Sequence, residues 1–250
     1  MKYKNQLTMK KLILLGTAIL VCQLSSAQWF GQNNIKGNGN VVQEKRTTES
    51  YDQIKMAGFF DVELVSGTEG SITVTGEENL IPHIITEVIG NELIIKTENG
   101  YNLQPSKRTG ILVKVPFESL DEVNLTGSGN IIGKDVVRAK SFKTKLTGSG
   151  DIQLHLETES VETALVGSGD IELKGTTQKV VHQVTGSGDI DAYDLKATDA
   201  EANISGSGDI NLHCDGSLKV RISGSGDVSY VGNPSKEDSK VAGSGDVTRE

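Results

Sequence analysis

The residues best placed to do chemistry are aspartates that recur at nearly constant spacing along the chain. Each follows a Gly-Ser-Gly tripeptide, and the set comprises Asp151, Asp170, Asp189, Asp209, Asp227 and Asp246. Carboxylates stacked about 5 Å apart would repel one another by roughly 1 kcal/mol per pair in water. Backbone amides at each turn are the favoured answer to this repulsion, and Ca²⁺ ions that bridge the layers are the alternative. In that alternative the aspartates are metal ligands, although known calcium-binding solenoids use a nonapeptide repeat, which is about half the length found in this chain.

A second polar column lies seven residues after the first glycine of each repeat. It contains Lys134, His155, Lys174, Tyr193 and His213. If the strands alternate, these side chains point outward and form a ligand-facing strip that could contact an acidic glycan or a protein. A solvated face is the competing interpretation, and it is favoured because the residues do not converge in a cleft.

Acidic side chains could also support polysaccharide cleavage. Solenoid enzymes of that kind need two or three acids, or acids with Arg or Lys, within a few ångströms across adjacent turns. Glu172, Asp191 and Asp194 could be grouped in this way, which keeps a polysaccharide-degrading enzyme as a further alternative. Acids in such repeats also group by chance, so we assign no catalytic residue. Cys214 has no repeated partner and is not expected to be a nucleophile.

The elements that would position these residues follow from the repeat itself. Gly-Ser-Gly followed by Asp or Asn begins at Gly127, Gly148, Gly167, Gly186, Gly206, Gly224 and Gly243. Apolar and polar residues alternate on both sides of each tetrapeptide, as in Ile152 and Leu154 after it and Phe142, Thr144 and Leu146 before it. This alternation predicts strands with one buried face. The period predicts an all-β fold, a parallel β-helix (solenoid) with turns of about 19 residues in which equivalent side chains stack.

The glycines have a steric explanation in such a stack. If one corner stacks directly on another, a Cβ at a turning position would strike the neighbouring layer or demand a positive φ. The short Ser and Asp side chains at the remaining positions can accept hydrogen bonds from nearby amides. The tetrapeptide is therefore interpreted first as a corner.

The chain divides into four segments by composition. A basic start, an apolar run too short to span a membrane and a small-residue site predict a cleaved signal peptide. A stretch rich in Asn, Gln and Gly then supports little burial, and strand-like runs without the repeat follow it. The segments are a signal peptide at 1–27, a flexible linker at 28–46, a β-rich head at 47–120 that joins the solenoid and covers its first turn, and the GSGD-repeat β-helix at 121–250.

Charge and cysteine content limit the partners. The net charge is −8, and loss of the four leader lysines makes it −12, which argues against a nucleic-acid partner. Aromatic residues make up only 4% of the chain, so stacking platforms are scarce. After leader cleavage only Cys214 remains, which excludes an intramolecular disulfide. No transmembrane segment is expected once the leader is removed, and the export site is the periplasm, the outer-membrane surface or the extracellular medium.

A longer arrangement of residues resembles a known family. The segments "SYDQIKMAGFFDVELV", "NELIIKT" and "ILVKVPFESLDEVNLTGSGNI", followed by GSGD turns, are similar to the bacterial family labelled putative auto-transporter adhesin, head GIN domain, a domain of unknown function. The resemblance runs from Tyr51 to Asp246. It implies a secreted or envelope-associated protein with a right-handed β-helix, of a type common in Bacteroidetes, and it carries over no catalytic residues.

These observations together favour an exported, non-enzymatic β-helix of the cell envelope or surface. Its expected role is adhesion, scaffolding or interaction through a long strip, with a surface glycan or protein as partner. No cofactor is expected, except calcium in the alternative of a calcium-stabilised solenoid. The oligomeric state is left open.

Overall fold

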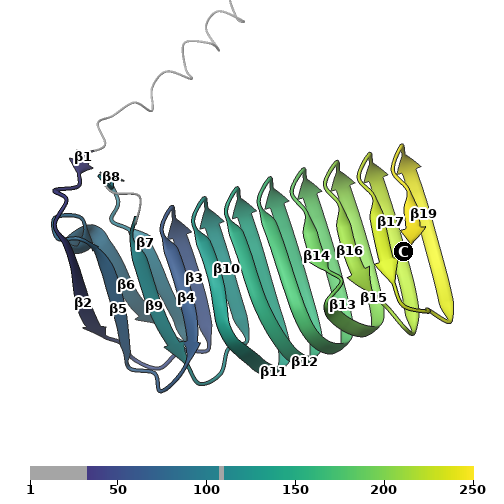
Figure 1. The fold of residues 1–250 in the computed structure, drawn as a ribbon, viewed down its shortest axis with the longest axis horizontal. Helices are drawn as coiled ribbons and strands as arrows, with labels where there is room; N and C mark the ends of the chain where they lie inside the picture. Colours follow the sequence, from purple (N-terminus) through teal and green to yellow (C-terminus); the bar gives the residue numbers. More distant parts are fainter. Residues whose placement is uncertain (1–32, 107–109) are drawn as a thin grey trace, which may run out of the picture.

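The computed structural model describes residues 33–106 and 110–250. The expected signal peptide, 1–27, and the first residues of the expected linker lie outside this range. Apart from a 3-10 helix, η1 (Ile81–His83), the regular elements of the described residues are strands. They wind into an elongated coil with two long walls, which meet at sharp corners along one side (Figure 1). In the described ranges, no helix is long and apolar enough to cross a membrane.

The repeat forms a parallel β-helix, as the sequence predicts. Each of the first repeats is one nearly continuous strand, and later turns are divided into two strands. The strands are β10 (Glu122–Gly127), β11 (Asn130–Gly148), β12 (Asp151–Gly167), β13 (Asp170–Gly186), β14 (Ile190–Ala192), β15 (Leu195–Gly206), β16 (Ile210–His213), β17 (Ser217–Gly224), β18 (Val228–Val231), β19 (Lys236–Gly243) and β20 (Val247–Arg249). Equivalent residues pair one turn apart, for example Ile152 with Ile171 and Leu146 with Leu165.

Two walls can be named from their place relative to the glycine corner. The pre-corner wall consists of the strand segments that end at the first glycine of each tetrapeptide. The post-corner wall consists of the segments that begin at or just after its aspartate. Both walls turn their alternate residues inward, and the predicted inward positions are buried. The isoleucine and valine column of the post-corner wall, 0% exposed throughout, comprises Val62, Ile131, Ile152, Ile171, Ile190, Ile210 and Val228.

The corners show why two glycines are needed. The first glycine of each repeat adopts a positive φ, 131° at Gly167, and a Cβ there would lie 2.1 Å from the carbonyl oxygen of Gly148 in the layer before. The third position is different, because Gly169 has no such φ. A Cβ on it would still lie 2.0 Å from the carbonyl oxygen of Gly150. Backbone conformation and interlayer contact therefore exclude a side chain at the first position, and contact alone excludes it at the third.

The head, 47–120, continues the coil. Strands β3 (Gln53–Gly58) and β4 (Asp61–Ser66) form a turn in register with the repeats, because Gly58 pairs with Gly127 and Val62 with Ile131. Gly58-Phe59-Phe60-Asp61 is thus an additional corner that precedes the seven recognised in the sequence. The buried residues of head and repeats form one continuous hydrophobic cluster.

The order of layers in space differs from the order in the chain. Strands β7 (Glu92–Thr97) and β9 (Leu112–Phe117) pair in parallel with β3 and β4 on the side away from the repeats. Strand β6 (Ile84–Ile89) then pairs antiparallel with β7, and β5 (Ser71–Glu77) antiparallel with β9. Strand β6 therefore ends one wall at the N-terminal end of the coil, whereas β5 is followed on the other wall by one more antiparallel strand, β2 (Val41–Thr47) (Figure 1).

The expectation of a flexible linker over 28–46 is wrong for much of that segment. Strand β1 (Asn33–Lys36) pairs in parallel with β8 (Tyr101–Gln104), and β2 (Val41–Thr47) pairs antiparallel with β5. The low apolar content misled the prediction because β2 is held by backbone pairing at the edge of a wall, which requires little burial. The Arg46 guanidinium also ties it down, since it donates to the carbonyl oxygens of Ile81, at 2.8 Å, and Ile84.

Candidate functional site

The aspartates of the corners form a ladder of carboxylates and amides. From Asp170 onward, the backbone N–H of each corner aspartate donates to the carboxylate of the aspartate one layer before, at 3.3 Å from Asp170 N to Asp151 Oδ1 and 3.1 Å from Asp189 N to Asp170 Oδ1. The same bond measures 2.7 Å at Asp209, Asp227 and Asp246. Amide capping of the stacked carboxylates, the favoured expectation, is confirmed. Hydrogen bonds to an ionised acceptor are about twice as strong as neutral ones, which offsets the repulsion between layers.

The serines between the two glycines behave differently from the aspartates. Their backbone N–H groups bind the preceding layer, as in Ser168 N to Gly148 O at 2.9 Å. Their hydroxyls were expected to join the hydrogen bonding, but in the part of the chain that the structure describes no hydroxyl of a corner serine from Ser128 to Ser244 has a hydrogen-bond partner. The corner thus depends on backbone contacts and on aspartate.

Acidic side chains line an open depression of about 340 Å³ on the post-corner wall. Glu172 and Asp191 are register partners there, and Asp151, Asp170 and Asp189 border the same depression. Asp194 lies apart from them, in the turn between β14 and β15. Among the described residues, no group of three or more His, Cys, Asp or Glu is arranged to hold a metal ion. The calcium alternative and the paired acids stay predictions.

The predicted ligand-facing strip does not form one continuous column in space, although its residues are evenly spaced in the sequence. His155 and Lys174 are register partners, and His213 pairs with Val231 further along the coil. Lys134 is displaced by a bulge, because Val136 takes its place opposite His155, and its ammonium lies 3.2 Å from Glu63 Oε1. Tyr193 lies in the turn after β14, outside the ladder. Extra residues in these two turns shift the spacing, so equal distance from the glycine does not give equal position in space.

One polar group is enclosed in the interior of the coil. His182 is 0% exposed, and neither ring nitrogen has a hydrogen-bond partner. It stacks between Thr163, whose hydroxyl is also unpartnered, and Ala202. Burial lowers the pKa of His182 from 6.5 to about 4. The imidazole is therefore neutral near pH 7 and is a packing residue, not a ligand for molecules in solution.

Cys214 is also directed inward and does not resemble a catalytic thiol. Its side chain is buried, with Sγ 3.3 Å from the carbonyl oxygens of Thr198 and Ser217. Burial raises the pKa of the Cys214 thiol, which disfavours the reactive thiolate. His213 points to the opposite face, as the alternation of the strand predicts.

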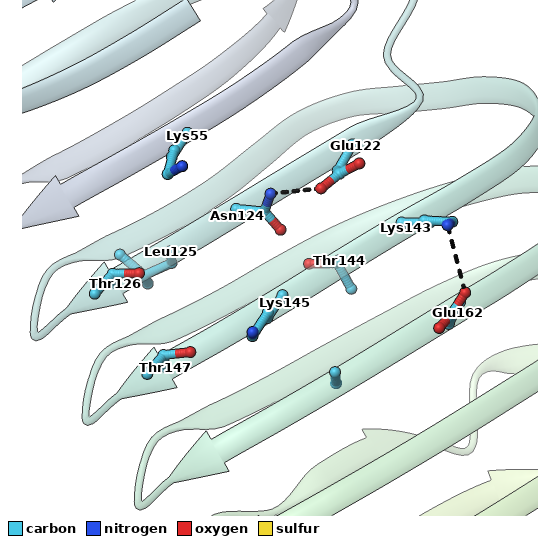
Figure 2. Close-up of a pocket in the computed structure, with 11 residues that line it drawn as sticks. Lys55, Glu122, Asn124, Leu125, Thr126, Lys143, Thr144, Lys145, Thr147 and Glu162 are labelled. Atoms are coloured by element: carbon cyan, nitrogen blue, oxygen red, sulfur yellow. Dashed lines mark hydrogen bonds and ion pairs between the residues drawn. The ribbon is translucent and has the colours of Figure 1, made fainter. Parts of the chain in front are cut away.

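The pre-corner wall carries a surface that the sequence reasoning did not single out. Its central column stands three residues before the first glycine of each corner, and we call it the pre-corner column. Two open depressions lie along it, one of about 380 Å³ (Figure 2) and one of about 360 Å³ further toward the C-terminal end. The members are Lys55, Asn124, Lys145, Ala164, Gln183, Asn203, Arg221 and Lys240. This column contains no acid. The alignment of the repeats on their first glycine already shows this absence, so the sequence could have indicated the column.

The post-corner wall has the opposite charge. Its outward positions at the corner aspartate and two residues beyond carry acids and no base. These acids are Asp61, Glu63, Asp151, Asp170, Glu172, Asp189, Asp191, Asp209, Asp227 and Asp246. The glycine corners therefore separate an acidic wall from a wall whose central column is basic and amide-rich.

The fold and these open, repetitive walls define a parallel β-solenoid with extended outer surfaces, the kind of architecture that presents binding groups in long arrays. The chain belongs to the family described as putative auto-transporter adhesin, head GIN domain, whose model matches residues 50–234. An adhesin-like interaction module is therefore the class that family and fold support. No curated protein is significantly similar to the chain.

Solved structures share this fold. A putative adhesin from Bacteroides fragilis has a TM-score of 0.81 at 20% identity, with 86% of this chain and 100% of that chain covered. A protein from Parabacteroides distasonis described as a putative lipid binding protein gives 0.72 at 28% identity, covering 87% and 100%. A putative adhesin from Parabacteroides merdae gives 0.71 at 24% identity, covering 87% and 99%.

Proposed function

We propose that the protein is an exported, non-enzymatic adhesion or scaffold module of the cell envelope or surface, which binds surface glycans or proteins. The observation that carries the proposal is the repetition of outward side chains over successive layers, which creates long open walls. Binding along such a wall adds many weak contacts, whereas catalysis requires a few groups held around one reacting bond.

Export is supported by the sequence and by the family. The basic start, apolar run and small-residue site before Gln28 are typical of a signal peptide. Membership of an adhesin family agrees with a surface or exported location. The periplasm, the outer-membrane surface and the extracellular medium all fit, and the acidic net charge of −8 disfavours a nucleic-acid partner.

The non-enzymatic part of the proposal is supported by the chemistry of the side chains. The thiol of Cys214 is buried, and the imidazole of His182 is enclosed in the core. Glu172 and Asp191 remain the residues on which a polysaccharide-degrading activity would depend, since they are adjacent across two layers. Both are exposed on an open wall, and the depression that they line is open rather than an enclosed cleft.

The test is a binding screen of residues 28–250 against arrays of glycans and bacterial or host surface proteins, together with an assay for glycan degradation. We expect specific binding without loss of polymer length. Degradation that disappears in Glu172→Gln or Asp191→Asn would overturn the non-enzymatic assignment. A screen without any bound glycan or protein would overturn the adhesion role.

A further inference from the structure

The central column of the pre-corner wall concentrates positive charge on an otherwise acidic protein. The pre-corner column carries four cations, Lys55, Lys145, Arg221 and Lys240, and no acid. Lys55, Asn124 and Lys145 stand on the successive strands β3, β10 and β11 in Figure 2, all on the outward side of the wall. The sign of this column is opposite to the net charge of the chain, which is −8.

Two of these cations are available to a ligand. Lys145 and Lys240 are exposed, and neither forms an ion pair or side-chain hydrogen bond with the described residues. Lys55 is only loosely engaged, with its ammonium 3.9 Å from Glu92 Oε2. Arg221 is bound more tightly, because its guanidinium donates to Asp238 Oδ2 at 2.6 Å. The wall therefore holds unpaired ammonium groups on β11, near its middle, and on β19, at its C-terminal end.

The acids beside the column are already engaged by neighbours. Asn124 Nδ2 donates to Glu122 Oε1 at 2.6 Å, and Lys219 Nζ donates to Glu201 Oε1 at 2.9 Å. The Lys219 ammonium also lowers the pKa of the Glu201 carboxyl. Since these carboxylates have partners, they repel an approaching anion less than free carboxylates would.

The spacing of the groups indicates what kind of anion fits. Lys145 and Lys240 are five layers apart, roughly 24 Å at about 4.8 Å per layer. Between them the column contains the amides of Gln183 and Asn203, and the neighbouring positions carry hydroxyls such as that of Thr185. Sparse cations separated by amides and hydroxyls match a polymer with sparse anions separated by hydroxyl groups.

We infer that the pre-corner wall binds an extended anionic polysaccharide, a polyuronate or sulfated glycan, along the axis of the coil. The inference rests on the proposed function and assigns its face and ligand class. A nucleic acid fits less well, because a duplex carries one charge per about 1.7 Å, and dense phosphates would face uncharged amides and the field of an acidic protein.

The experiment compares wild type with the double variant Lys145→Gln/Lys240→Gln in binding to immobilised alginate, a polyuronate, and to dextran sulfate, single-stranded DNA and neutral dextran. The matched control, Lys140→Gln/Lys196→Gln, removes the same charge from exposed positions outside both the pre-corner column and the ligand-facing strip. We expect wild type to bind alginate and not dextran, the double variant to bind about tenfold more weakly, and the control to change less than about twofold. Circular dichroism establishes that all three proteins share one fold.

Several outcomes would overturn the inference. Equal loss in both double variants would show that net charge alone is responsible. Equal affinity of wild type for single-stranded DNA and alginate would remove the assignment to a glycan. If wild type ignores alginate and dextran sulfate but binds other molecules on the arrays, the inference fails and the proposed function stands. If it binds nothing at all, both fail.

Discussion

A single methyl group at the third position of a corner should separate two layers of the coil. We consider Gly169→Ala, because this glycine has an ordinary φ and its substitution introduces no backbone strain. The added Cβ would lie 2.0 Å from the carbonyl oxygen of Gly150 and 3.0 Å from its carbonyl carbon. Both contacts are with backbone, so no side chain can move aside to relieve them.

The expected cost follows from the distance that must be opened. A tolerable contact requires the layers to part by about 1 Å at the corner, which carries N–H···O distances beyond the hydrogen-bond range. The bonds at risk are Ser168 N to Gly148 O, at 2.9 Å, and Asp170 N to Asp151 Oδ1, at 3.3 Å. Two lost bonds at about 1 kcal/mol each and overpacking of about 1 to 3 kcal/mol predict a destabilisation of about 3 to 5 kcal/mol.

Urea denaturation followed by far-ultraviolet circular dichroism measures this free energy of unfolding. Gly67→Ala is the matched control, since Gly67 also has an ordinary φ and its nearest neighbour to a new Cβ is Pro116 Cβ at 3.6 Å. That variant should be neutral or more stable by up to about 1 kcal/mol. Ser168→Ala, in the same corner, should change stability by less than about 0.5 kcal/mol. A loss at Gly169→Ala within about 1 kcal/mol of the Gly67→Ala value would refute the contact between layers.

Two further predictions concern protons and metal ions. The pKa of His182 is about 4 in the folded chain against the ordinary 6.5 of a histidine side chain, so the unfolded state binds more protons between these values. The free energy of unfolding, measured in urea titrations, should therefore fall by about 2 kcal/mol from pH 7 to pH 5. The variant His182→Val, which places the residue type of Val220 in the same column, should remove this part of the fall. An unchanged pH dependence in the variant would contradict the burial of a neutral imidazole. Because amides cap the aspartate ladder, the melting temperature should be the same in excess EDTA and in millimolar Ca²⁺; a clear rise with Ca²⁺ would favour the calcium-stabilised alternative.

The inward and outward faces could be predicted because the repeat supplies its own alignment. Ile152 and Ile171 occupy one column in the sequence and in space, since the corner fixes the register on one side of each turn. The prediction weakens with distance from the glycine. Lys134 and Tyr193 were assigned by counting, and bulged or inserted residues carry them out of the column.

The arrangement of the head could not be predicted in the same way. The corner Gly58-Phe59-Phe60-Asp61 keeps the first glycine and the aspartate but replaces the third glycine with a buried aromatic residue, so the tetrapeptide is not recognisable. Pairing of β3 between β7 and β10 joins segments far apart in sequence, and no period indicates their order. The pre-corner column was visible in the alignment, but its meaning depends on which cations lack partners, and only coordinates show that.

The antiparallel strands β5 and β6 at one end of the coil have a consequence for how the protein can evolve. Every later turn presents the same backbone pattern above and below, so duplication or deletion of a whole unit leaves each remaining junction intact. The head has no such freedom, because its strands interlock out of chain order. Gain or loss of whole units can therefore change the length of the coil in steps of about 4.8 Å while the head stays the same.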